Sequence, residues 1–262
     1  MFNNSGILFL FLSILFFSSC RKEGGQVVSV VKDNYTIQEQ KTLGEELDAV
    51  YQSELSILSE DAYPDAYEYV TTLYNMIVHT PSVELRDSLN WQVRIIADDS
   101  KYQIFVSPSG IMYLTTGLLK QLDAENQLVS LMAHGVYYLE SGAAFDLVKQ
   151  KNDPLEVGKV VLGETSTKVG DMANTLLFAA FSEDIVQEAD DFEVDLLCPF
   201  KYNTMGLIDV YSNIEIQSSL SQTMPWNSKR AANIALISQG CGVDDSLFVE
   251  RYQDFKESTL PE

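Results

Sequence analysis

The segment around His134 constrains the fold of this chain most strongly. Its apolar residues recur at intervals of three and four positions, which places them on one face of an α-helix. These residues are Leu128, Leu131, Met132 and Val136. The pattern predicts a long, buried helix at the centre of the molecule, with Asp123 as its N-terminal cap.

The residues before this helix predict two more helices and a small sheet. Thr36 and Glu39 form a capping box that starts one helix, and Pro64 suits the first position of a second. Three strands are expected, at residues 91–97, 102–106 and 111–115. Residues 98–101 are expected to form the turn between the first two strands. The expected fold class is therefore α+β, mainly helical, with a small sheet beside the central helix.

The C-terminal half is expected to be helical. Residues 151–170 hold three glycines and a proline, which indicates a loop or a broken helix. Residues 171–197 are predicted to form one long helix. Further helices are expected from Thr204, Asn227 and Asp244. His79 is expected to end an earlier helix, where it interacts with the helix dipole. Residues 35–262 are predicted to form a single domain.

The N-terminus has the features of a lipoprotein signal peptide. Ile7–Phe17 is an apolar run too short to span a membrane, which takes about 20 residues. It ends at Phe17-Ser18-Ser19-Cys20, which resembles a bacterial lipobox. We therefore expect residues 1–19 to be a signal peptide, Cys20 to be lipidated, and residues 20–34 to be a tether. The expected location is the bacterial cell envelope, periplasm-facing or at the surface; an uncleaved N-terminal membrane anchor is the alternative.

The charge balance limits the partners. The chain has 38 acidic and 17 basic side chains and a formal charge of −21. Nucleic acid is an unsuitable partner, because binding its phosphates needs clusters of lysine and arginine. Contact with an anionic membrane is expected only through the lipid anchor. With Cys20 lipidated, Cys198 and Cys241 remain, and they are either free or joined in one disulfide.

Part of the central helix is similar to a zinc-peptidase motif that has lost its chemistry. In HExxH, two histidines four positions apart bind one zinc ion, and the glutamate between them activates a water molecule. Here His134 stands at the first ligand position, Gly135 at the general-base position and Tyr138 at the second ligand position.

The sequence around this motif resembles the HtpX-like and CAAX prenyl endopeptidase group of zinc metallopeptidases, especially its periplasmic BepA-like members. The segments that carry the resemblance are Tyr35–Gln40 with Leu43–Gly44, Ala62–Tyr67, Ile104–Gly110, Met112–Leu119, Glu188–Asp190, and Thr223–Pro225 with Arg230. The resemblance implies that Val186 occupies the position of the third zinc ligand, and Met224 that of a late histidine. It also implies that Asp190 is the carboxylate that would orient a ligand.

These positions predict a catalytically inactive metallopeptidase-like envelope lipoprotein, a pseudopeptidase that binds extended polypeptides or a protein partner in cell-envelope quality control. Catalytic zinc needs three protein ligands and a base, and only His134 is left of that set. We expect His134 to be a buried structural group paired with Asp190, and no cofactor. The expected partners are envelope proteins or peptides, bound as an extended strand along the sheet edge, as the resemblance implies; no small-molecule cofactor is expected.

Two other functions remain open. One is an active zinc-dependent endopeptidase or hydrolase with a non-standard metal site. Its ligands would be His134 together with carboxylates from Glu183, Asp184, Glu188 or Asp190. The other is a purely structural accessory subunit.

Overall fold

The computed structural model describes residues 31–32, 35–242 and 246–261. The expected signal peptide and Cys20 lie outside these residues. The described chain is mainly helical with a small three-stranded sheet, which confirms the α+β class. A separate short antiparallel pair joins β1 (Val31–Lys32) to β2 (Tyr35–Thr36), directly before the first helix.

Two helices precede the sheet, as the sequence predicts. The capping box starts α1 (Ile37–Glu54): Glu39 N–H donates to Thr36 Oγ1 over 3.2 Å, and the Glu39 carboxylate accepts from Thr36 N–H. Pro64 opens α2 (Pro64–Val78). His79 caps the C-terminal end of α2, with its Nδ1 2.8 Å from Asn75 O. The turn η1 (Glu84–Asp87) then leads into the sheet.

The sheet contains the three predicted strands in an unpredicted order. They are β3 (Gln92–Ile96), β4 (Ile104–Ser107) and β5 (Ile111–Thr115). The order is β3-β5-β4, with β5 parallel to β3 and antiparallel to β4. Residues 98–101 connect β3 to β4 along the chain, but these two strands are not neighbours in the sheet, because β5 lies between them. All five residues of β5 are buried, which suits the central position.

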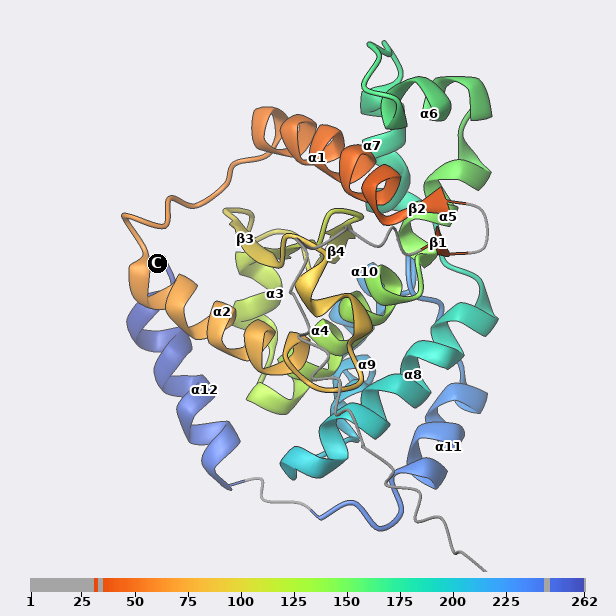
Figure 1. The fold of residues 1–262 in the computed structure, drawn as a ribbon. Coiled ribbons are helices and arrows are strands. Elements are labelled where there is room, and N and C mark those ends of the chain that lie inside the picture. Colours follow the sequence, from red (N-terminus) through yellow and green to blue (C-terminus); the bar gives the residue numbers. More distant parts are fainter. Residues whose placement is uncertain (1–30, 33–34, 243–245, 262) are drawn as a thin grey trace, which may run out of the picture.

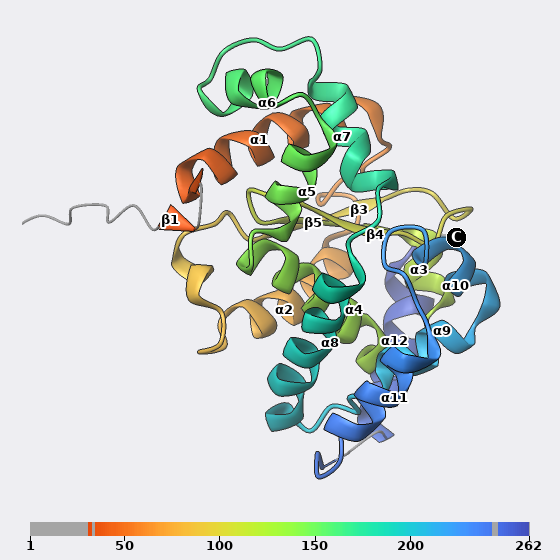
Figure 2. The same cartoon turned by 90° about the vertical axis from the view of Figure 1, so that its right-hand side faces the viewer.

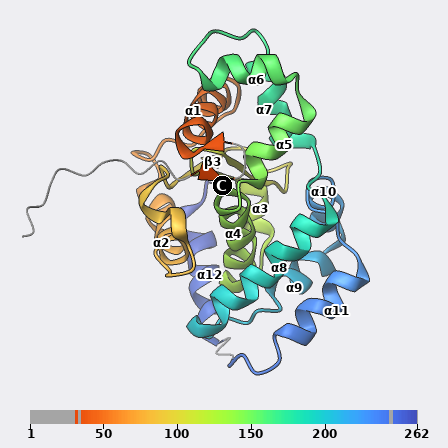
Figure 3. The same ribbon diagram turned by 45° about the vertical axis from the view of Figure 1, so that its right-hand side comes forward.

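The helix α4 (Glu125–Glu140) lies at the centre of the molecule (Figure 3). It contacts α2, α5 (Ala143–Lys151), α8 (Glu183–Leu197) and β4. The predicted cap was wrong, because the N-cap is Ala124 and no side chain caps the helix. Asp123 lies one residue too early, and its backbone N–H instead donates to Gln127 Oε1 over 2.7 Å.

The sheet lies between two groups of helices (Figures 1 and 2). On one side are α1, α6 (Pro154–Val161) and α7 (Val169–Phe178), and on the other are α2 and α4. Both α1 and α7 contact β4. The short helix α3 (Thr116–Gln121) connects β5 to the central helix region.

The single helix predicted over residues 171–197 is broken. Residues 179–182 form an extended linker between α7 and α8. The break arises because Ser182 caps a new helix: its Oγ accepts from Ile185 N–H, and Glu183 and Asp184 follow in the first turn. We name residues 179–182 the α7–α8 linker.

The remaining residues form a cluster of short helices against α4 and α8. These are η2 (Cys198–Phe200), α9 (Gly206–Ser212), α10 (Ile214–Leu220), α11 (Ser228–Ile237) and α12 (Ser246–Thr259). The pairing that the sequence left open is present, since a disulfide joins Cys198 to Cys241. Within the described residues, no helix has both the length and the apolar character needed to cross a membrane.

Candidate functional site

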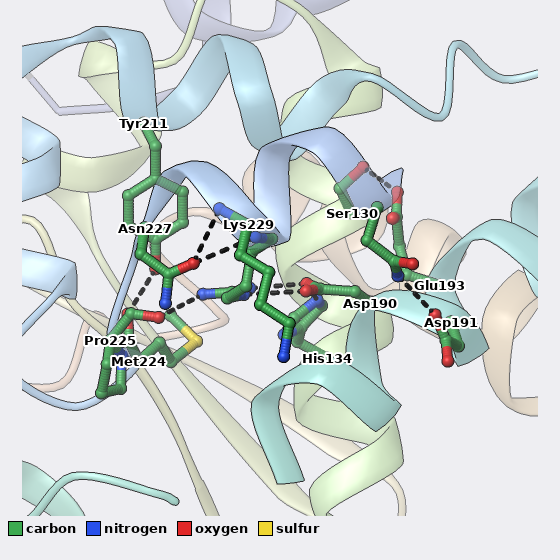
Figure 4. Close-up of polar contacts among 12 residues, drawn as sticks. Ser130, His134, Asp190, Asp191, Glu193, Tyr211, Met224, Pro225, Asn227 and Lys229 are labelled. Carbon is green, nitrogen blue, oxygen red and sulfur yellow. Dashed lines mark hydrogen bonds and ion pairs between the residues drawn. The ribbon is translucent and has the colours of Figure 1, made fainter. Parts of the chain in front are cut away.

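The residues that the sequence compared with a zinc motif form part of a buried polar cluster between α4 and α8. Figure 4 shows the carboxylate of Asp190, from α8, beside the ring of His134, from α4. His134 Nε2 lies 3.1 Å from Asp190 Oδ1, and both side chains are almost fully buried. The structure therefore brings together the two residues that the sequence paired.

Burial favours the neutral form of His134. It is the main cause that lowers the pKa of the ring below its ordinary value, although the Asp190 carboxylate opposes this shift. The Nδ1 atom lies 3.3 Å from the Tyr138 hydroxyl, which can donate to it. Nε2 lies close to the Asp190 carboxylate, but it makes no hydrogen bond with any described residue.

Asp190 is held mainly by Arg230 of α11. The guanidinium donates from Nε to Asp190 Oδ2 over 2.7 Å and from Nη2 to Oδ1 over 2.5 Å. Burial raises the pKa of Asp190, but the hydrogen bonds from Arg230 and the contact with His134 outweigh it and hold the pKa below its usual range. Asp190 is therefore an anion whose charge is balanced by Arg230.

Arg230 is itself fixed on its other sides. Its Nη1 donates to Pro225 O over 2.6 Å, and its guanidinium carbon lies 4.7 Å from the centre of the Trp226 ring. The sequence marked Arg230 as a landmark but did not predict this ion pair. A lone buried arginine needs an anionic partner, yet nothing in the spacing identifies that partner across 40 residues.

The other positions that the sequence compared with zinc ligands are packed with apolar contacts. Val186 is fully buried. The Tyr138 ring stacks on Phe181 of the α7–α8 linker, with 3.9 Å between ring centres. Met224, which the sequence compared with a late histidine, is 4 % exposed. The side chains present do not fit a zinc ion, because Asp190 is bound by Arg230 and Val186 and Met224 offer no zinc ligand.

The relocated metal site that the sequence left open is not assembled. Glu183, Asp184 and Glu188 are exposed on α8, and only Asp190 reaches His134. Over the part of the chain that the structure describes, no three histidine, cysteine or acidic side chains are grouped to hold a metal ion.

Gly135 lets α4 pack closely on the sheet. A β-carbon at this position would lie 2.5 Å from Met112 Cε and 3.1 Å from Val106 Cγ1. A side chain at position 135 would therefore point into packed side chains of β4 and β5. Close packing accounts for a glycine inside a helix, where it costs about 1 kcal/mol relative to alanine.

A buried carboxyl group that the sequence did not predict lies one turn further along α8. Glu193 is fully buried, and its Oε1 accepts from Ser130 Oγ of α4 over 2.6 Å. Burial raises the pKa of Glu193 to about 8, so the carboxyl is mainly protonated at neutral pH. Its Oε2 has no hydrogen-bond partner among the described residues.

The second feature of the site is the outer edge of β4. Thr115 N–H donates to Gln103 O over 3.1 Å, so the backbone of residue 103 faces β5. Because antiparallel strands alternate, the backbones of Phe105 and Ser107 also face β5, while those of Ile104 and Val106 face away. No described residue pairs with the N–H or C=O groups of Ile104 and Val106, although both residues are buried.

This edge borders a narrow space that we name the β4 groove. Its walls come from β4, from α4 around Gly135 and Tyr138, and from Leu176, Phe181, Thr223 and Met224. Only about 20 Å³ is free, which is room for about one water molecule. Phe181 N–H donates to Thr223 O over 3.0 Å, so two loops close the groove together.

Two larger cavities adjoin the β4 groove. Phe181 also lines a cavity of about 340 Å³ that extends past Ala143 and Leu147. Phe105 also lines a cavity of about 320 Å³ that extends past Asp98 and Phe178. Each of these cavities shares one lining residue with the β4 groove, Phe181 in the first case and Phe105 in the second.

Comparisons with known proteins add no assignment to this geometry. Neither the protein-family models nor the curated proteins contain a match to this sequence. The buried cluster and the β4 groove are the two features of the molecule that bear on its function.

Proposed function

We propose that this chain is a non-catalytic, metallopeptidase-like envelope lipoprotein that binds an extended segment of another polypeptide along β4. The observation that carries the proposal is the unpaired edge of β4, where the backbone groups of Ile104 and Val106 have no partner among the described residues. Buried backbone groups without partners cost free energy. An added strand would satisfy them.

The absence of catalysis in this proposal follows from the residues at the former zinc positions. Hydrolysis by the zinc mechanism needs an activated water molecule and a base near it. Gly135 cannot act as a base, and Arg230 already neutralises Asp190. A fixed guanidinium in this position also disfavours a second cation nearby.

The groove predicts the character of the bound segment. Its walls beside the free edge are mostly apolar, with Leu131, Tyr138 and Met224 among them. A bound strand would place alternate side chains toward these walls. Segments with apolar residues at every second position therefore fit, and the closing loops have to move before such a segment enters.

The test uses the purified chain and a synthetic ten-residue peptide with alternating valine and threonine. Two N-methylated versions are compared, one blocked at the odd-numbered and one at the even-numbered amides. Strand addition predicts that one version loses binding by at least roughly tenfold, because its methyl groups replace the amide hydrogens that pair with β4. The other version, methylated at the amides that face away from β4, is expected to bind nearly as well as the parent peptide. Equal effects of the two versions would contradict strand addition.

A matched pair of variants locates the binding. Thr223→Trp places a large side chain in the β4 groove, whereas Gln222→Trp places it at the neighbouring exposed position. Only Thr223→Trp is expected to weaken peptide binding. Chelator-sensitive cleavage of the peptide by the natural chain would overturn the non-catalytic reading and favour an active hydrolase.

A further inference from the structure

A separate cavity of about 610 Å³ lies between α2, η2 and α12, and none of its lining residues borders the β4 groove. We name it the α2–α12 pocket. Its volume is in the range of pockets that bind small molecules. In Figure 1, α2 and α12 lie on the side of α4 opposite to α8.

Much of the wall of this pocket is aromatic. Tyr69, Phe200, Tyr202 and Phe248 line it. The Tyr202 and Phe248 rings stack with 4.3 Å between their centres, and Tyr69 stacks on Phe255 at 4.1 Å. Phe200 keeps 42 % of its surface exposed. Three of these rings are thus fixed by packing, while Phe200 remains accessible from solvent.

A buried carboxylate holds the rings in place. Glu125, at the start of α4, is fully buried and accepts from the hydroxyls of Tyr69 over 2.5 Å and Tyr202 over 2.6 Å. Arg251 of α12 donates to the same carboxylate from Nε over 2.6 Å and also from Nη2. The charges of Glu125 and Arg251 balance each other, so this network sets geometry rather than net charge.

The charge that remains in the pocket is negative. Asp65 and Glu68 line it from the first turns of α2, and both are exposed. They lie three positions apart, so they share one face of the helix. The Arg251 guanidinium already lies 5.5 Å from the centre of the Phe248 ring. An aromatic wall next to carboxylates therefore favours an amphipathic cation, because the carboxylates attract its charge and the rings cover its apolar body.

We propose that the α2–α12 pocket binds a small organic cation, namely an ammonium group carried on an apolar body. The ammonium group lies at Asp65 and Glu68, and the apolar body lies against the aromatic wall around Phe200 and Phe248. This site is independent of peptide binding at β4.

The test compares three probes of similar size with the purified chain: phenethylammonium, 2-phenylethanol and phenylacetate. Affinities are measured by chemical-shift titration. The cation is expected to bind roughly three- to tenfold more tightly than the neutral alcohol, and the anion to bind most weakly. If the alcohol binds as tightly as the cation, or if none of the three probes binds, the proposal is overturned.

Variants connect the preference to the pocket. The double variant Asp65→Asn with Glu68→Gln is expected to remove the preference for the cation and to leave binding of the alcohol unchanged. The matched control is Glu183→Gln with Asp184→Asn, which removes two exposed charges from the first turn of α8. A preference that survives in the first double variant would overturn the assignment, as would its loss in the control.

Discussion

Gly135 lies where a side chain would press against the sheet. We expect Gly135→Ala to stabilise the chain by clearly less than the roughly 1 kcal/mol that helix propensity alone would give. The added β-carbon would lie 2.5 Å from the flexible end of Met112 and 3.1 Å from Val106 Cγ1, so both side chains have to shift. Urea denaturation measures the difference.

The chain offers a matched control for this prediction. Gly158 also lies within a helix, α6, and a β-carbon there would contact nothing within 4 Å. Gly158→Ala is therefore expected to raise the free energy of unfolding by up to about 1 kcal/mol. If Gly135→Ala raised the free energy of unfolding as much as Gly158→Ala does, close packing would not explain Gly135.

Glu193 predicts a pH dependence of stability. Its pKa is raised to about 8 in the folded chain from an ordinary value near 4.5, so the folded state binds the proton more tightly. Its contribution to the free energy of unfolding is fully present below about pH 4.5 and is lost as the pH rises toward 8. The loss is at most about 1.4 kcal/mol per pH unit.

The variant Glu193→Gln isolates this contribution, because glutamine has the same shape and does not titrate. Relative to the natural chain, the variant is expected to gain stability steadily between pH 5 and pH 8. Urea denaturation at several pH values measures the gap between the two proteins. A gap that stays constant with pH would mean that Glu193 is not protonated in the folded state.

At the scale of elements, the Asp190–Arg230 pair joins α8 to α11. Breaking a buried pair from one side leaves an uncompensated charge and costs about 3–5 kcal/mol. We expect Asp190→Leu and Arg230→Met each to show such a loss, and the double variant to lose clearly less than the sum. Additive losses in a double-mutant cycle would show that the two side chains act independently.

Local patterns predicted the elements better than their arrangement. The capping box, Pro64 and the three strands are local signals, and the structure confirms them. The strand order was not predicted, because pairing with β5 depends on contacts distant in sequence. The break at Ser182 was missed although its signal is local: a serine followed by Glu183 and Asp184 is a helix start.

The candidate site shows the same difference between local signals and contacts distant in sequence. The positions of His134 and Asp190 were predicted through the resemblance, and they do lie together. The partner of Asp190 was not predicted, because Arg230 reaches it from a separate helix. The unpaired edge of β4 also depends on strand order, so the sequence alone could not reveal which strand lies at the edge of the sheet.

At the scale of the whole molecule, the disulfide closes a segment that includes α9, α10 and α11. Cys198 and Cys241 are separated by 43 positions. In the chain-entropy description, such a loop contributes about 4 kcal/mol. We expect the double variant Cys198→Ser with Cys241→Ser to lose roughly 2–4 kcal/mol. Thermal unfolding with and without reductant measures this loss; reductant should affect only the natural chain.

The proposed function requires that the edge of β4 accepts an extended polypeptide. Amide hydrogen exchange at Ile104 and Val106, followed by NMR with and without the alternating peptide, tests this requirement. Added strand pairing predicts that both amides exchange at least roughly tenfold more slowly in the complex, while the amide of Phe105, which already faces β5, changes little. Protection confined to other elements, with Ile104 and Val106 unchanged, would contradict the account.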